Sequence, residues 1–172
     1  KSRDDLPASI GVPARTFISV PMAILQSGAR VRFMDYAWSG IYRLHSIPVI
    51  DGALRFRRGM YAEGLHCLSL QARKSLPIGE GGAVLTDDED ACDWLRAARY
   101  CGRRAPHYRI EDVNMLGWNC YMTPEKAARG LHLLEYAGDG EPDLVVEYPD
   151  LRLAPIFREQ ILDLRDPARL AA

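Results

Sequence analysis

Leu65-His66-Cys67-Leu68-Ser69-Leu70 is an apolar run, and Gly79-Glu80-Gly81-Gly82 is a glycine cluster, with Lys74 between the two. The apolar run has the length and composition of a buried strand. The glycines give the backbone the freedom to start a second strand, Ala83–Leu85, close beside the first. The pattern therefore predicts a lone lysine at a turn where a buried strand ends. Such an amine loses charge to desolvation and becomes a nucleophile for an aldehyde, whereas the alternative is an ordinary solvated turn lysine.

The bulk composition indicates a soluble globular domain without a polyanionic partner. The chain has 172 residues, with 48% hydrophobic and 26% charged residues, which suits one α/β domain with its own core. Its net charge of -1 gives no electrostatic reason to expect nucleic acid, and no apolar run approaches the length that crosses a membrane. We expect neither as a partner.

The four cysteines predict neither a metal site nor a disulfide framework. They are irregularly spaced, contain no C-x-x-C pair and lie in no ligand pattern with the four histidines. Thiols of this kind are typical of the reducing cytoplasm, which is the localisation we expect. The first residue is Lys1, and we expect it to be either a point within a longer polypeptide or the start of a trimmed one.

The apolar spacing predicts alternating strands and helices. Strands are expected at 15–20, 30–34, 47–50, 65–70 and 83–85, and helices at 22–26, from a Thr86–Glu89 capping box to about residue 100, and from Thr123 with Pro124 at its first position. The first strand, helix and strand indicate a parallel α/β unit. Residues 103–111 are expected to form a polar loop, and the chain from Leu151 a tail.

Three further side chains have positions from which they could serve a ligand. Asp51 follows a buried strand, where functional carboxylates gather in α/β sheets, and it could keep a pyridine nitrogen protonated; it could equally cap a turn. Ser69, near the end of the strand before Lys74, could donate to a phosphate or be a half-buried neutral residue. Asn119 precedes the second long helix and could reach a ligand or another subunit, or simply lie in a turn.

Around these residues the chain resembles the DegT/DnrJ/EryC1/StrS aminotransferases. The resemblance is carried by the runs 67–74 and 79–88, in which a lysine is followed by Gly-Glu-Gly-Gly and a strand. Three further matches occur in the same order, at 16–35, at 48–53 and at Leu116-Gly117-Trp118-Asn119-Cys120-Tyr121-Met122. The resemblance covers roughly residues 13–134.

The resemblance implies a fold-type I pyridoxal-phosphate (PLP) transferase-like α/β core with a mostly parallel sheet. This core would occupy residues 1–137, and residues 138–172 would be the remnant of a truncated C-terminal domain. Family members transfer an amino group from an amino-acid donor to a keto-sugar attached to a nucleotide, in polysaccharide biosynthesis and related pathways, and they are homodimers with sites at the interface. The resemblance therefore predicts an aminotransferase that uses pyridoxal 5'-phosphate.

Five positions of this chain take roles from the resemblance. Lys74 would form the Schiff base with PLP, Asp51 would pair with the pyridine nitrogen, and Ser69 would bind the cofactor phosphate. Gln71 stands where the family usually has a histidine, and Asn119 would reach the phosphate in the site of the partner subunit. In strict register, many members carry their aspartate where this chain has Gly52.

The sequence also departs from the family, and alternatives therefore remain open. Residues 1–12 lack the family's Ser-Gly-Thr phosphate loop, and the segment between Asp35 and Val49 is short. One alternative is a non-catalytic relative that keeps the fold and acts as a binding or assembly module. Another is an α/β domain of unrelated function.

Overall fold

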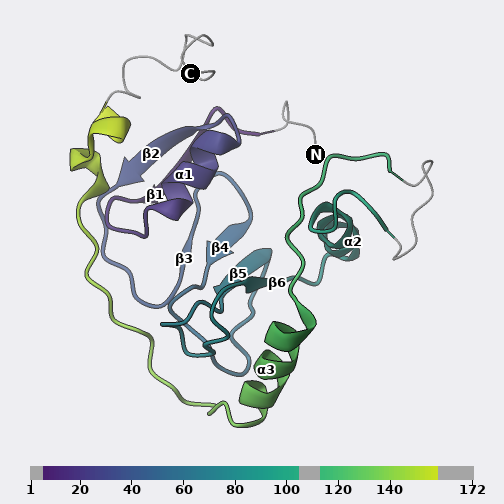
Figure 1. Cartoon of the computed structure of the whole chain (residues 1–172). Helices are drawn as coiled ribbons and strands as arrows, with labels where there is room; N and C mark the ends of the chain where they lie inside the picture. The colour runs from purple at the N-terminus through teal and green to yellow at the C-terminus, as the bar shows by residue number, and fades with distance from the viewer. Residues whose placement is uncertain (1–5, 105–112, 159–172) are drawn as a thin grey trace. The chain divides into compact units, whose positions relative to one another are not determined.

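A computed structural model describes residues 6–104 and 113–158, and these form two compact units (Figure 1). The first unit contains residues 1–49 and 145–172, and the second contains residues 50–144. Each unit is described by itself below. The domain boundary that the resemblance predicts near residue 137 stays a prediction.

The first unit is built on a parallel strand pair joined by a helix. Strand β1 (Ser9–Pro13) is followed by α1 (Ser19–Gln26) and β2 (Arg30–Met34), and the two strands pair in parallel from Ser9 opposite Arg30 to Pro13 opposite Met34. The predicted parallel α/β unit is thus confirmed, but the strand predicted at 15–20 is wrong. Those residues lead into α1 through helical-type bonds such as Val20 N–H to Phe17 C=O, because Pro21 fits the first turn of a helix.

The core of the first unit lies between β1, α1 and the chain after β2. Its buried members are Ile10, Val12, Ile24, Ala29, Tyr42 and Leu44. The tail returns to this unit: η3 (Leu151–Leu153) begins where the Leu151 amide donates to the Ala14 carbonyl, and Phe157 packs edge-on against Phe33 with ring centroids 5.2 Å apart. Residues far apart in the sequence therefore share one core.

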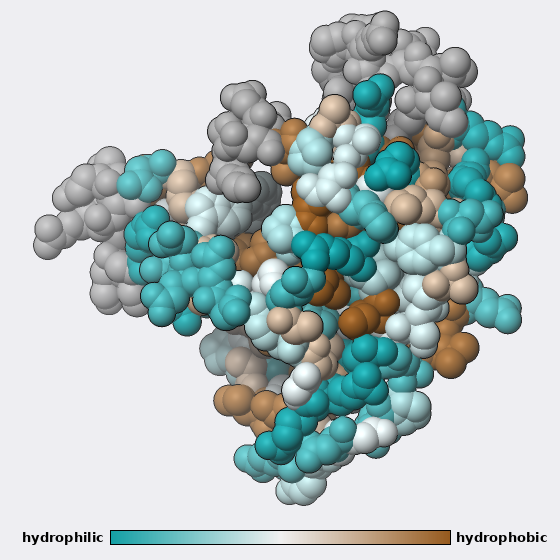
Figure 2. Space-filling view, turned by 180° about the vertical axis from the view of Figure 1, so that it is seen from behind, coloured by the Kyte–Doolittle hydropathy of each residue, from teal (hydrophilic) through white to brown (hydrophobic). Residues whose placement is uncertain are grey.

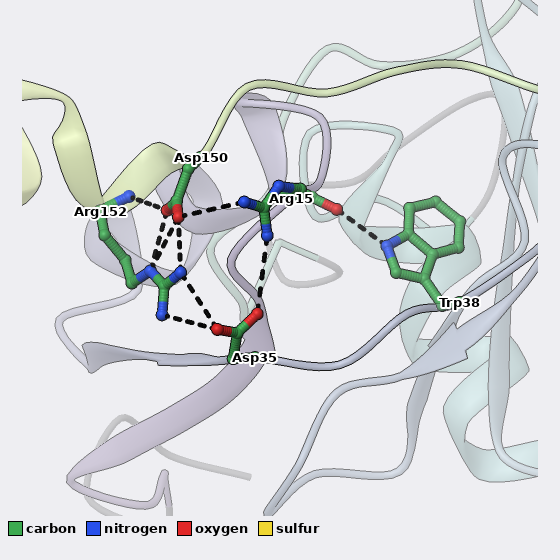
Figure 3. A network of polar contacts seen from close by, with 5 residues as sticks. All are labelled: Arg15, Asp35, Trp38, Asp150 and Arg152. Atoms are coloured by element: carbon green, nitrogen blue, oxygen red, sulfur yellow. Dashed lines mark hydrogen bonds and ion pairs between the residues drawn. The ribbon is translucent and has the colours of Figure 1, made fainter.

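An exposed network of charges joins the same tail to the ends of β1 and β2 (Figure 3). Arg152 contacts Asp150 at 2.5 Å and Asp35 at 3.3 Å, while Arg15 contacts the same two carboxylates at 3.7 and 3.5 Å. The hydrogen bond from Arg152 is the main cause that lowers the pKa of Asp150 to about 2. Because such pairs are solvated, they fix position more than they stabilise.

The second unit contains most of one strand, two further strands and both longer helices. Strands β4 (Val49–Asp51), β5 (Leu65–Ser69) and β6 (Gly82–Leu85) are neighbours in that order, and the unit boundary falls after Val49, within β4. Strand β3 (Tyr42–Arg43) lies in the first unit. Strands β5 and β6 are antiparallel, with Ser69 opposite Gly82. A Cβ at Gly82 would lie 2.4 Å from the Leu68 carbonyl oxygen, so this crossing requires glycine.

Helices α2 (Glu89–Ala98) and α3 (Pro124–Glu135) follow the sheet. Helix α3 begins after Thr123 as predicted, whereas the capping box at Thr86 is wrong. Asp88 is the N-cap of α2, and its side chain accepts from the Ala91 amide at 2.9 Å, while the Thr86 hydroxyl accepts from the Asp88 amide. Much of the loop predicted at 103–111 lies outside the described residues.

Helix α3 buries none of its residues. Leu131 and Leu134 are 68% and 50% exposed. Elsewhere too, hydrophobic side chains reach the surface and lie among hydrophilic ones, as Figure 2 shows for one face.

Candidate functional site

The backbone around Lys74 forms a tight turn closed by the glycine cluster. The Lys74 amide donates to the Gln71 carbonyl at 2.9 Å, and the amides of Leu70 and Ala72 donate to the carbonyls of Gly81 and Gly79. The Gln71 side chain accepts from the Arg73 amide within the same turn. Gln71, which the resemblance places beside the cofactor, is therefore exposed and engaged in shaping the turn.

An apolar base and helix α3 hold this turn in place. Leu70, Leu76 and Ile78 form a buried cluster. From α3, Lys126 forms an ion pair with Glu80 of the glycine cluster, and Arg129 donates to the Pro77 carbonyl at 3.1 Å. The loop that follows the lysine is thus anchored at both its apolar and its polar side.

Lys74 and Asp51 come within electrostatic reach of one another. Burial lowers the pKa of the half-buried Lys74 amine, and the negative charge of Asp51 opposes that shift. Asp51 is the last residue of β4, and its carboxylate accepts from the Ala53 amide at 2.8 Å. Burial, with the charge of Asp51 as the second cause, also raises the pKa of the Cys67 thiol to about 11. The structure therefore places the predicted carboxylate within electrostatic reach of the predicted lysine.

Ser69 and Asn119 are placed differently from each other. Ser69 ends β5, is half-buried, and its hydroxyl makes no hydrogen bond with any described residue. Asn119 is exposed and pairs through its backbone with Tyr100, just after the end of α2. The structure thus places Ser69 on the strand that leads to Lys74, while the role of Asn119 toward a partner subunit stays a prediction.

His66 is a feature of the site that sequence reasoning missed. Its side chain is fully buried, and neither ring nitrogen has a hydrogen-bond partner among the described residues. A Cβ at Gly52 would lie 2.2 Å from His66 Nε2, so the imidazole fills the space that a side chain at position 52 would need. Burial and the charge of Arg55 lower the pKa of His66, and Asp51 opposes them. A histidine inside an apolar strand was the available signal.

The fold is that of the PLP-dependent aminotransferases. A crystal structure of a protein named as a PLP-dependent aminotransferase from Bacillus cereus superimposes with a TM-score of 0.63 and 18% sequence identity, over 76% of this chain and 47% of that chain. The predicted α/β class and fold-type I core are thereby confirmed.

Residues 57–139 match the model of the DegT/DnrJ/EryC1/StrS aminotransferase family. A Streptomyces kanamyceticus protein, named as an L-glutamine:3-amino-2,3-dideoxy-scyllo-inosose aminotransferase, is 27% identical over 71% of this chain and 30% of its own length. The resemblance to this family that the sequence predicts is confirmed. The chain spans less than a third of the length of the Streptomyces relative. The matched segment contains Lys74, Ser69, Gln71 and Asn119, and Asp51 precedes it.

The side chains present fit a PLP group by their chemistry. A half-buried amine with a lowered pKa suits the aldehyde, a carboxylate within its electrostatic reach suits a protonated pyridine nitrogen, and an unengaged hydroxyl at a strand end suits a phosphate. Among the described residues, no three His, Cys, Asp or Glu side chains lie together as metal ligands would. In the same part of the chain, no helix is long and apolar enough to cross a membrane.

Proposed function

We propose that the chain is the PLP-binding part of an aminotransferase that transfers an amino group from an amino-acid donor to a keto-sugar, in the nucleotide-linked form that the family resemblance implies. The observation that carries this proposal is the half-buried Lys74 amine in the turn between β5 and β6, within electrostatic reach of the Asp51 carboxylate. Burial lowers the pKa of the amine although a carboxylate lies within electrostatic reach, and this is the balance that a nucleophilic lysine needs.

Each residue has a distinct task in this proposal. PLP, when bound, supplies an electron sink for the carbon that gains or loses the amino group. Lys74 Nζ would hold the aldehyde end of the cofactor, and the freed amine would move a proton between atoms of the substrate. The Asp51 carboxylate would accept a hydrogen bond from the protonated ring nitrogen, and the Ser69 hydroxyl would donate one to the phosphate. Because burial lowers the pKa of the Lys74 amine, removing its proton costs less than for a fully solvated lysine.

The substrates and the assembly are part of the proposal. The named activity of the Streptomyces relative, with glutamine as donor and an amino-cyclitol ketone as acceptor, supports an amino acid and a sugar-like ketone here. The family resemblance supports a homodimer in which Asn119 reaches the site of the partner, and a role in polysaccharide biosynthesis. Free cysteines at positions 67, 92, 101 and 120 accord with a cytoplasmic location.

Covalent labelling tests the proposal sharply, because the sequence contains only three lysines, Lys1, Lys74 and Lys126. The protein is incubated with PLP, reduced with borohydride and digested, and the labelled peptides are identified by mass spectrometry. We expect the label on Lys74. Lys74→Arg should lose it, and the matched control Lys126→Arg, which keeps the ion pair with Glu80, should label like the parent protein.

Two results would count against the enzyme. Label spread evenly over the three lysines would mean that Lys74 is an ordinary surface amine. Label on Lys74 that glutamate or glutamine fails to displace before reduction would mean that the cofactor is held without amino transfer. The second result would favour the non-catalytic binding module.

A further inference from the structure

A second place in the second unit has the chemistry of a binding site. A hollow of about 720 Å³ lies between the end of α2 and the chain that leads into α3. Its wall includes four arginines from one short stretch, Arg96, Arg99, Arg103 and Arg104, with Tyr100 and Tyr121 beside them. Lys74, Asp51 and Ser69 do not line it, so this inference stands apart from the proposed function.

The backbone around the hollow is closely fitted. The Trp118 amide donates to the Ala98 carbonyl at 2.6 Å, and the Cys120 amide donates to the Arg99 carbonyl at 2.9 Å, so that the segment before α3 pairs with the end of α2 (Figure 1). A Cβ at Gly117 would lie 2.0 Å from the Gly102 nitrogen, so the two segments approach as closely as glycines allow. The side chains of the wall are therefore carried by a defined backbone.

The charge of the hollow is concentrated and only partly compensated. Asp93 is the acidic residue of the wall, and it pairs with Arg96 at 3.6 Å. The Arg103 guanidinium lies 3.9 Å above the Tyr100 ring. Arg99 and Arg104 are exposed and form no ion pair with a described residue. In a chain whose net charge is -1, this excess of positive charge is local.

Guanidinium groups and aromatic rings together suit one kind of ligand. Arginine presents several donors in a planar fork that matches phosphate oxygens, and its charge remains at every physiological pH. The Tyr100 and Tyr121 rings, with centroids 5.1 Å apart, add a partly apolar surface for a group attached to the phosphate. We infer that this hollow binds a phosphorylated small molecule, with its phosphate on Arg99 and Arg104 and its attached group beside Tyr121.

Calorimetric titration tests this inference with pyrophosphate, adenosine diphosphate and adenosine as probes. We expect saturable binding of both phosphorylated probes that weakens as salt is added, and none of adenosine. Tighter binding of the nucleotide than of pyrophosphate would show that the attached group is recognised, and equal binding would show that phosphate alone is. Adenosine binding as tightly as the nucleotide would overturn the inference, as would the absence of binding by both phosphates.

Charge-matched variants locate the site. Arg99→Gln with Arg104→Gln should weaken binding about tenfold for each arginine. Arg30→Gln with Arg57→Gln removes the same charge from exposed positions elsewhere and should leave the affinity within about twofold. Equal losses in the two pairs would mean that only net charge matters and would overturn the site. Arg99→Lys with Arg104→Lys keeps the charge without the planar fork of the guanidinium. Its affinity for the phosphorylated probes should lie between that of the parent protein and that of the double glutamine variant.

Discussion

Replacing Gly52 by alanine should lower the free energy of unfolding, because β4 and β5 fit tightly at this position. The new methyl carbon would lie 2.2 Å from Nε2 and 2.7 Å from Cδ2 of His66, and 3.2 Å from the Cys67 carbonyl oxygen. The two ring distances are far inside van der Waals contact, and the ring is fully buried, so the surroundings must shift. Overpacking of this kind costs about 1–3 kcal/mol in free energy of unfolding.

A double-mutant cycle with His66→Ala isolates the overlap. Once the ring is gone, the nearest remaining atom is the Cys67 carbonyl oxygen at 3.2 Å. Gly52→Ala should then change the free energy of unfolding by less than about 0.5 kcal/mol, or stabilise slightly through the unfolded chain. The expected coupling is therefore about 1–3 kcal/mol. His66→Ala opens a cavity but also removes two unpaired nitrogens, so its own effect matters less than the coupling.

Urea unfolding followed by tryptophan fluorescence and circular dichroism measures the four free energies. The matched control is Gly130→Ala in α3, where a Cβ would meet only Ile78 at 3.4 Å and better helix propensity should stabilise by up to about 1 kcal/mol. An equal cost of Gly52→Ala with and without the His66 ring would refute the reasoning, because the clash would then lie elsewhere.

Three further predictions concern pH, the tail core and the charge network. Burial lowers the pKa of His66, so below about pH 6.5 the unfolded chain takes up a proton that the folded chain resists. The free energy of unfolding should therefore decrease as the pH is lowered below this value, and it should decrease less in His66→Gln. Denaturant titrations across this pH range measure both. Phe157→Ala should cost about 3–5 kcal/mol in the same assay, because the ring is 4% exposed against Phe33, and a loss below about 1 kcal/mol would mean that the tail is not part of the core. Asp150→Asn should lower the melting temperature at low salt but little at high salt. The parent protein should lose this contribution to its stability as the pH falls from about 4 toward the Asp150 pKa of about 2. A difference in melting temperature between the two proteins that is equal at all salt concentrations would contradict the ion-pair origin.

Part of the candidate site could be predicted because it depends on patterns among residues that are neighbours in the sequence. The apolar run of β5, the lysine after it and the glycines before β6 are local patterns, and the structure forms β5, the turn and β6 at those positions. The start of α3 was predictable for the same reason, since Pro124 suits the first position of a helix. The strand at 15–20 was misjudged because β-branched and aromatic residues also occur at the entry to a helix.

The lysine turn, the α/β class and the family resemblance follow from local sequence, because strand periodicity, glycine turns and short motifs act over a few residues. Which distant groups meet depends on the tertiary structure. It places Asp51 within electrostatic reach of Lys74 and the His66 ring where a side chain at Gly52 would stand. It also gathers the arginines at and just after the end of α2 beside Tyr121, and packs Phe157 against Phe33. These contacts depend on how strands and helices pack, and no local pattern of residues carries that information.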